Sequence, residues 1–364
     1  MLWFSKKLSS HSRLGIDIGT TSIRVVKIRK YSTPQLVDGK EKIGELQNYG
    51  EVLNRGLLPS SPGEKMTNQR QLFSESEVVR SIKLLLSYLE ETEKEVVMAI
   101  PMYSVFVDQL KLPAMSFEEI PSAIEFEARG HIPVPIEDVK LAWQIIGEDR
   151  PQGNSSDLVA RRILLIAVPK ETIFMYEGIA KQLGLSLKSL EIESASIIRA
   201  LNLTSQGVFV LLDIGGRNTN ISLIRNGFLA LSHHIEISGE EITKSIARGL
   251  GISMNRAQEF KEKEGLTMAG RNPELANLLY PIIDRIVDEV KRTLGVVPEE
   301  EIKKLILVGG SSSLLGLREY IHERLVVPID IADPWAKIDY NPALENKLHS
   351  HGLKFTVAVG LALS

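Results

Sequence analysis

One short pattern occurs twice in this chain, and it constrains the fold more than any other feature. The stretch LGIDIGTTSIRVVKIR begins at Leu14, and VLLDIGGRNTNISLIRNG begins at Val210; each contains Asp-Ile-Gly directly after an apolar run. In both copies a polar turn follows, and then a second apolar run. The repeat predicts two related halves, each with a hairpin that carries an aspartate near the end of its first strand.

The turn of the first hairpin is suited to an anion, because small and hydroxyl residues let backbone N–H groups approach a ligand closely. An aspartate beside such a turn fits only if a cation lies between them, and hydrated Mg²⁺ is the usual partner. Taken alone, the segment is better explained as an ordinary polar hairpin. The second copy favours a triphosphate between the two turns, with Mg²⁺ between Asp17 and Asp213.

A third segment, KLILVGGSSSLLGLREYIHERL from Lys304, predicts an apolar strand, a turn at Gly309-Gly310 and an amphipathic helix. The apolar face of that helix would contain Leu314, Leu317, Ile321 and Leu325. Two glycines at a strand-to-helix turn allow a flat ligand to approach the backbone, near a helix N-terminus that favours negative charge. The sequence contains no Walker A pattern, which excludes a P-loop enzyme.

Composition sets further limits. A chain of 364 residues usually forms more than one domain, and 43% hydrophobic with 24% charged residues is ordinary for a globular protein. A formal net charge of −3 gives no electrostatic argument for nucleic acid as a partner. The absence of cysteine excludes disulfides and thiolate chemistry and fits a cytoplasmic protein. No apolar run is long enough to span a bilayer.

Together the three motifs resemble those of the actin-like ATPase superfamily. The phosphate-one pattern D-x-G-[ST]-x-x-x-[KR] matches the first hairpin, D-x-G-[GDA]-x-x-T matches the second, and G-G-[ST] after an apolar strand matches the third. The resemblance implies an α/β, actin-like (ribonuclease H-like) fold of two related lobes that binds ATP with Mg²⁺ between them. It predicts Asp17 and Asp213 as the metal-facing acids.

The resemblance also assigns the nucleotide contacts. The predicted phosphate-binding residues are Gly19, Thr20, Thr21, Ser22, Arg24, Gly215, Gly216, Asn218 and Thr219. The predicted adenosine-binding residues are Lys261, Gly309, Gly310, Ser311 and Ser312. Bulky Arg217 in the second turn is unusual for the pattern, and so is Arg24 where lysine is common.

Two of the site residues have competing interpretations. Glu193 lies where this superfamily often has a glutamate that orients the attacking water, which makes it the candidate catalytic residue. A solvated glutamate at a helix N-terminus explains it equally well. Lys261 resembles a lysine near the adenosine, whereas a solvent-facing charge is the simpler interpretation.

Within the superfamily, the chain resembles the PilM family of type IV pilus assembly proteins, which is related to the cell-division protein FtsA. The match includes LPAMSFEEIPSAIEFEARGHIPVPIEDVKLAWQII, which lies in a small β/α insertion, and the terminal VAVGLAL. The expected domains are as follows: the first lobe in residues 1–95 and 164–205, the insertion in 96–163, the second-lobe core in 206–240 and 300–344, a helical subdomain in 241–299, and a C-terminal helix returning to the first lobe in 345–364.

The PilM resemblance implies a partner. The expected partner is the N-terminal cytoplasmic peptide of a PilN-like bitopic inner-membrane protein, which would hold a cytoplasmic protein at the membrane without an anchor of its own. An extended peptide could lie along the insertion, and the candidate contacts are Val105, Val107, Ala123, Ile124, Phe126 and Glu127. The alternative is that these apolar residues pack the insertion's own core.

Other functions stay open at this level. An FtsA-like filament-forming ATPase and a small-molecule kinase of the same fold are the alternatives to a pilus assembly protein, and any ATPase activity is expected to be slow. The sequence does not decide whether the chain self-associates or contacts the pilus motor ATPase.

Overall fold

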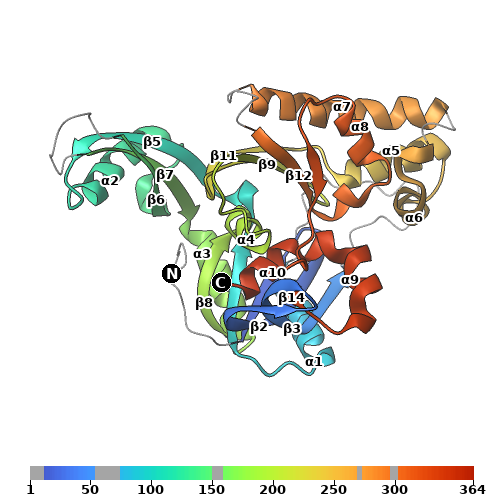
Figure 1. Ribbon diagram of the computed structural model, residues 1–364, viewed down its shortest axis with the longest axis horizontal. Helices are drawn as coiled ribbons and strands as arrows, with labels where there is room; N and C mark the ends of the chain where they lie inside the picture. The colour runs from blue at the N-terminus through green and yellow to red at the C-terminus, as the bar shows by residue number, and fades with distance from the viewer. Residues whose placement is uncertain (1–11, 54–73, 150–158, 269–272, 296–301) are drawn as a thin grey trace.

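The computed structural model describes residues 12–53, 74–149, 159–268, 273–295 and 302–364. Two lobes are each built on a twisted sheet, and a smaller sheet with one helix projects to the side (Figure 1). This arrangement confirms the expected α/β fold of two lobes with an insertion.

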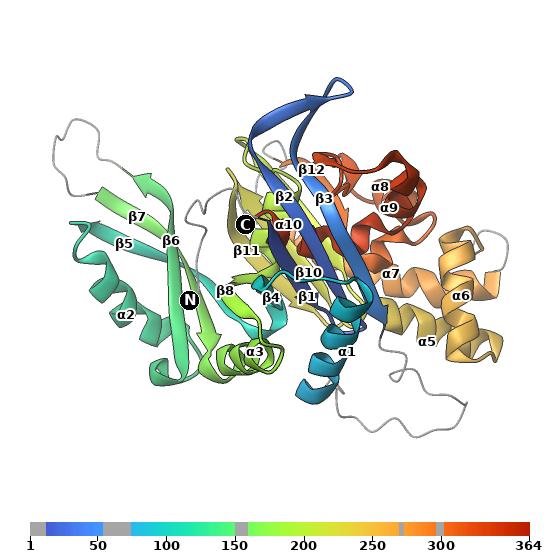
Figure 2. The same cartoon turned by 90° about the horizontal axis from the view of Figure 1, so that it is seen from below.

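The first lobe contains a six-stranded sheet in the order β14-β3-β2-β1-β4-β8. Its strands are β1 (Arg13–Ile18), β2 (Ser22–Val37), β3 (Lys40–Leu53), β4 (Glu95–Ile100), β8 (Ser186–Ile192) and β14 (Ile338–Asp339). β1 pairs antiparallel with β2 and parallel with β4, so the predicted first hairpin is present. The ends of β2 and β3 extend beyond the rest of the sheet as a two-stranded arm (Figure 2).

The second lobe repeats this topology in a five-stranded sheet of order β11-β10-β9-β12-β13. Its strands are β9 (Val208–Ile214), β10 (Thr219–Arg225), β11 (Phe228–Ile235), β12 (Ile302–Val308) and β13 (Ile329–Ile331). β9 pairs antiparallel with β10 and parallel with β12, as β1 does with β2 and β4. The sequence repeat is therefore a repeat of strand topology, with the two aspartates on equivalent central strands.

The helices cover the sheets by burying apolar stripes. They are α1 (Glu75–Tyr88), α3 (Lys170–Gln182), α4 (Glu193–Ala200) and α10 (Thr356–Ala362) in the first lobe, and α5 (Gly239–Leu250), α6 (Met254–Glu264), α7 (Pro273–Leu294) and α8 (Leu317–His322) in the second, with α9 (Glu345–His351) between. Ser74 and Glu77 form a capping box at the start of α1. α10 lies directly on β1 because Gly15 has no side chain; a Cβ there would be 2.3 Å from the carbonyl oxygen of Ala358.

One predicted helix is shorter than expected. The apolar spacing from Leu314 to Leu325 suggests a helix over the whole stretch, but a 3-10 turn covers Gly310–Ser313 and α8 is confined to Leu317–His322. Leu314 and Leu325 are buried as well, but they lie in the loops that flank α8. The N-terminus of α8 is consequently not at the glycine pair.

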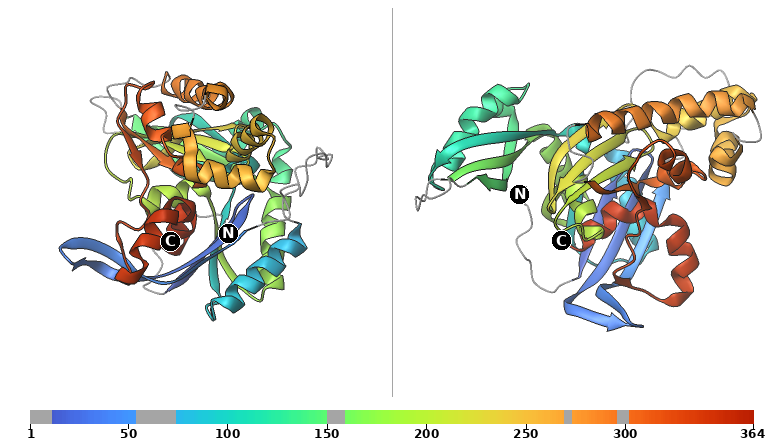
Figure 3. Two further views of the ribbon diagram at one scale, coloured as in Figure 1. Left: turned by 90° about the vertical axis from the view of Figure 1, so that its right-hand side faces the viewer. Right: turned by 45° about the horizontal axis from the view of Figure 1, so that its top comes forward.

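The insertion is a three-stranded antiparallel sheet of order β5-β7-β6 with α2 on one face. Its elements are β5 (Phe106–Met115), α2 (Ile120–His131), β6 (Val139–Asp149) and β7 (Val159–Pro169). The right-hand view of Figure 3 shows it projecting away from the two lobes.

Two expected boundaries of the insertion differ from the structure. β4 belongs to the first-lobe sheet, so the insertion does not begin at residue 96, and β7 continues to Pro169 as the central insertion strand, beyond the expected end at 163. The two strands have nearly the same apolar sequence, and such runs do not reveal which sheet they join.

The chain crosses between the lobes twice. The first crossing leads from β8 through α4 to β9, and the second leads from β13 through residues 332–337 to β14, which pairs with β3. The return to the first lobe therefore begins before residue 345. Trp335 lies in the second crossing and packs against Tyr49 and Phe355.

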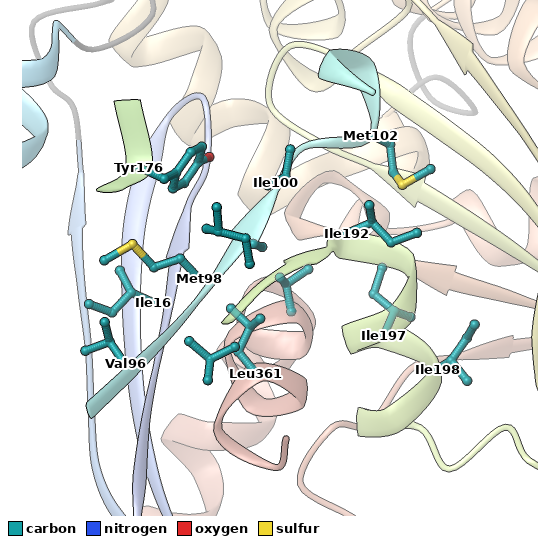
Figure 4. Close-up of a cluster of buried hydrophobic side chains, with 14 of the residues drawn as sticks. Ile16, Val96, Met98, Ile100, Met102, Tyr176, Ile192, Ile197, Ile198 and Leu361 are labelled. Carbon is teal, nitrogen blue, oxygen red and sulfur yellow. The ribbon is translucent and has the colours of Figure 1, made fainter. Parts of the chain in front are cut away.

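The main core joins the two lobes. Ile16, Met98 and Ile192 of the first lobe belong to the same buried cluster as Leu211 and Val308 of the second. Figure 4 shows the part of this cluster around β4, α4 and α10. The strands that carry the predicted site residues therefore rest on one shared core.

Candidate functional site

The two hairpin turns face one another across a cavity of about 530 Å³ between the lobes. Each turn is closed by the same hydrogen bond, from the Gly19 N–H to the Ser22 carbonyl oxygen (3.0 Å) and from the Gly215 N–H to the Asn218 carbonyl oxygen (2.8 Å). The turns approach so closely that a Cβ on Gly216 would lie 2.4 Å from Cγ2 of Thr21. Their backbone groups can therefore act on one shared ligand.

Most of the residues that the sequence predicts for the nucleotide do line this cavity. They are Asp17, Gly19, Thr20, Thr21, Ser22, Arg24, Glu193, Asp213, Gly215, Gly216, Asn218, Lys261, Gly309, Gly310 and Ser311. They come from both lobes and from five separate segments of the chain. The cavity thus brings the three predicted motifs together.

Burial raises the pKa of three carboxylates in the cavity wall. Desolvation, followed by repulsion from Asp17, raises the pKa of Asp213 to about 6. Desolvation and the charges of Asp213 and Asp17 raise the pKa of Glu193 to about 8. Burial likewise raises the pKa of Asp17, although Arg24 opposes the shift. A cation among these groups would relieve both the repulsion and the desolvation.

The carboxylates do not form a direct metal cage. Within the described residues, no three acidic, histidine or cysteine side chains are close enough together to hold a metal ion by themselves. Mg²⁺ usually keeps several waters and takes one or two carboxylates together with substrate phosphates. Asp17 and Asp213, on facing turns, fit that second mode of binding.

Arg24 lies beside Asp17, next to the first turn. Its Nη1 is 3.0 Å from Oδ2 of Asp17, its Nε is 3.1 Å from Oε1 of Glu51, and its Nη2 donates to the Ser22 hydroxyl. The Ser22 side chain is thereby engaged with Arg24 in this structure.

Glu193 faces the cavity at the start of α4 and is half-buried there, so its catalytic role stays a prediction. Its Oε2 accepts a hydrogen bond of 3.0 Å from the N–H of Met102, two residues after the end of β4. Pro101 and Tyr103 on either side of Met102 also line the cavity. The first residues of the insertion are consequently part of the cavity wall.

The second turn is held by the start of α5. The N–H of Glu240 donates to the Gly216 carbonyl oxygen (2.8 Å), and the Glu240 carboxylate pairs with Nε of Arg217 at 3.1 Å. The bulky arginine is thus held by Glu240 at the cavity wall. Thr219 differs from its predicted phosphate role: it is fully buried in β10 and its hydroxyl donates to the Ile237 carbonyl oxygen (2.7 Å).

The glycine pair after β12 lies against the second turn. Gly309 has a φ of +83°, and a Cβ there would be 2.2 Å from Oδ1 of Asp213. The Ser311 hydroxyl donates to the Gly215 carbonyl oxygen (3.2 Å). Ser312 does not reach the cavity as predicted, because its buried hydroxyl donates to Val308; Ser313 lines the cavity in its place.

Lys261 is buried, so the interpretation as a solvent-facing charge is wrong. Its ammonium donates to the Gly239 carbonyl oxygen and to the Thr243 hydroxyl, both at 2.8 Å. Desolvation lowers its pKa to about 8. These contacts tie α6 to the start of α5 at the edge of the cavity.

Several cavity residues carry no sequence signal that we recognised. Glu51 on β3 and Lys354, just before α10, are the charged ones, and Tyr103, Thr243 and Gln258 are polar. Lys354 precedes the apolar terminal helix, and only the way this helix returns to β1 brings it to the cavity. Glu51 reaches the cavity because the register of β2 and β3 places it opposite Arg24.

The six predicted peptide contacts do not lie on one surface. Ile124 is buried in the insertion's own core with Leu110 and Ile163, so for this residue the alternative interpretation holds. Val105 and Val107 pack toward the first-lobe cluster, whereas Ala123 packs on the α2 side of the sheet. Phe126 is 73% exposed on α2. Successive residues of a strand point to opposite faces of the sheet. The valines on the first-lobe side and the α2 residues on the other side therefore do not share a surface.

No helix in the described ranges is both long and apolar enough to cross a membrane. The longest described helix, α7, carries charged residues along its length, including Lys291 and Arg292 in its last turn.

Comparison with known proteins gives a family match. A sequence model of the family described as "Type IV pilus assembly protein PilM" matches residues 15–364. Among curated proteins, the cell division protein FtsA of Staphylococcus epidermidis is 20% identical over 90% of this chain and 75% of its own length. FtsA of Bacillus subtilis is 27% identical over a stretch that covers 34% of this chain and 33% of that protein.

Solved structures share the fold. The structure described as a PilM-PilN type IV pilus biogenesis complex has a TM-score of 0.76 and 23% identity, and the match covers 98% of each chain. MreB 5 of Spiroplasma citri bound to AMPPNP has a TM-score of 0.56 and 13% identity, over 98% of this chain and 96% of that one. Both relationships show the actin-like fold for this chain.

Proposed function

Because the chain belongs to the PilM family of type IV pilus assembly proteins, we propose that it binds ATP with Mg²⁺ between its lobes and thereby shapes a protein interface. The observation that carries the proposal is the pair of facing turns, with Asp17 and Asp213 at the end of equivalent strands. Residues of both turns line a cavity that is rich in carboxylates. Such a combination suits a phosphate chain accompanied by a cation.

The residues have separate roles in this proposal. The turns at Gly19–Ser22 and Gly215–Asn218 donate to phosphate oxygens, and the glycine pair at Gly309 leaves room for the nucleoside. Bound Mg²⁺ would neutralise phosphate charge near Asp17 and Asp213. Glu193 would hold a water near the terminal phosphate, in a site where positioning is the main source of catalysis.

We expect hydrolysis to be slow and the role to be structural. Glu193 already accepts a hydrogen bond from the Met102 N–H, so its lone pairs are only partly available to a water. The same bond links the cavity to the start of the insertion. A change at the phosphate end would therefore reach the insertion directly.

The proposed partner is the N-terminal cytoplasmic peptide of a PilN-like membrane protein, which would keep this chain in the cytoplasm at the inner membrane. The similarity to a chain solved in a PilM-PilN complex supports this partner. The insertion is the proposed docking element, because it projects from the lobes and carries exposed apolar groups such as Phe126.

Titration calorimetry with ATP and ADP, in Mg²⁺ and in EDTA, tests the nucleotide site. Asp17→Asn should weaken Mg-ATP binding at least about tenfold, because it removes a carboxylate that faces the cation. Asp288→Asn is the matched control, since Asp288 is exposed on α7 away from the cavity. Equal Mg-ATP affinity in both variants would exclude this site.

A further inference from the structure

Three charged residues form a straight line across the first three strands of the first lobe. In the strand register Asp17 on β1 is directly opposite Arg24 on β2, and Arg24 is directly opposite Glu51 on β3. Side chains directly opposite on neighbouring strands interact strongly. Arg24 therefore lies between two carboxylates, one of which is the predicted metal-facing acid.

The guanidinium of Arg24 divides its donors between these acids. Nη1 is 3.0 Å from Asp17, Nε is 3.1 Å from Glu51, and the Arg24 side chain is only 13% exposed. A guanidinium has five N–H donors in a rigid plane, so it can hold both acids without rotating. In this arrangement Arg24 is the counter-ion that neutralises Asp17.

Glu51 has a second cation as well. Its Oε2 is 3.8 Å from Nζ of Lys354, and its side chain is 17% exposed. Burial would raise the pKa of Glu51, but Arg24 and Lys354 outweigh burial and hold the pKa below its usual value. The Glu51 carboxylate is therefore charged at neutral pH, and it remains a partner for Arg24 whatever happens at Asp17.

We infer that Glu51 is a positioning residue for the nucleotide site: it retains Arg24, so that Asp17 can exchange its internal counter-ion for Mg²⁺. The inference rests on the proposed function. Without Glu51, Arg24 would have Asp17 as its one remaining carboxylate partner among those that the structure shows, and the cation would compete against a tighter ion pair. The loss of one negative charge would also make the turn more attractive to phosphate alone.

These two effects have opposite signs, which makes the test specific. We compare Glu51→Gln with the native chain by calorimetry, using ATP in EDTA and ATP in Mg²⁺. ATP alone should bind at least about threefold more tightly to the variant, while the enhancement of ATP affinity by Mg²⁺ should fall about tenfold. A variant that only loosened the fold would weaken both affinities.

The chain offers a matched control. Glu45→Gln removes the same side-chain charge from the same strand, where Glu45 pairs with Arg29 across β2 and β3 outside the cavity. This variant should leave both affinities unchanged. Thermal unfolding of each variant reports whether the fold is retained, and glutamine at position 51 keeps an oxygen that can accept from Arg24.

A double-mutant comparison identifies the route of the effect. In an Arg24→Met background, Glu51→Gln should change the Mg²⁺ enhancement less than about twofold, because the residue through which it acts is gone. If Glu51→Gln lowers the Mg²⁺ enhancement fully in the Arg24→Met background, or not at all in the native background, the inference about Glu51 is overturned. The proposed nucleotide site is not affected by either result. If the native chain binds ATP neither in EDTA nor in Mg²⁺, both the inference about Glu51 and the proposed function are overturned.

Discussion

Replacing Asp213 by asparagine should make the ligand-free protein more stable. In the folded chain desolvation and Asp17 raise the pKa of Asp213 from 3.8 to about 6. The folded state therefore binds this proton more tightly than the unfolded state. The stabilisation of the folded state by this bound proton is complete below pH 3.8 and is lost as the pH rises through about 6. At pH 8 the ionised carboxylate opposes folding, and Asp213→Asn removes this opposition.

The pKa difference sets the size of the effect. At about 1.4 kcal/mol per pH unit, the gain in the free energy of unfolding is at most about 3 kcal/mol, because the half-buried carboxylate keeps some contact with water. Urea unfolding followed by circular dichroism between pH 5 and pH 8 measures it. The advantage of the variant should be largest at pH 8 and should shrink on acidification.

Saturating Mg-ATP should reverse the order of stability. A ligand that binds the folded state stabilises it according to its affinity, and the native chain gains this stabilisation while the variant loses much of it. Asp288→Asn, on the exposed face of α7, should show neither effect. A variant no more stable than the native chain at pH 8, or an advantage that is independent of pH, would refute the electrostatic account.

Two further outcomes test the remaining roles. Glu193→Gln should keep ATP affinity within about threefold but lower any ATPase rate at least about tenfold, as measured by phosphate release; native turnover near ten per second would favour a metabolic kinase instead. Deletion of 106–169 with a short linker keeps Met102 and Tyr103 beside the cavity. It should abolish binding of a PilN-like peptide in fluorescence anisotropy and preserve ATP binding. Phe126→Asp and Val107→Ser then separate the two faces of the insertion, and a deletion variant that still binds the peptide would place the partner elsewhere.

The parts of the fold that could be predicted from sequence are local. The hairpin at Asp17 and the hairpin at Asp213 were predictable because apolar runs, a polar turn and a glycine lie within a few residues of one another. The capped helix after Ser74 is equally local. The repeat added the one long-range prediction, that the two hairpins share a ligand, and the facing turns agree with it.

What could not be predicted depends on side-chain direction and on strand pairing. Thr219 and Ser312 lie next to cavity residues, but strand alternation and a 3-10 turn point their hydroxyls into the core. Glu51 reaches Arg24 through the register of β2 and β3, which no motif records. The boundary error at residue 163 has the same origin, since an apolar strand does not specify its sheet.

The two chain crossings have a mechanical consequence. Two bodies joined by two short segments keep one easy motion, a rotation about the line between the joints, as in a hinge. One joint is α4, which begins with Glu193, and the other contains Trp335. Gln109 of the insertion donates to the Ala230 carbonyl oxygen on β11, outside both joints. A rotation that narrows the cavity must therefore strain or shift the contact between Gln109 and Ala230. The angle between the lobes and the orientation of the insertion cannot change independently.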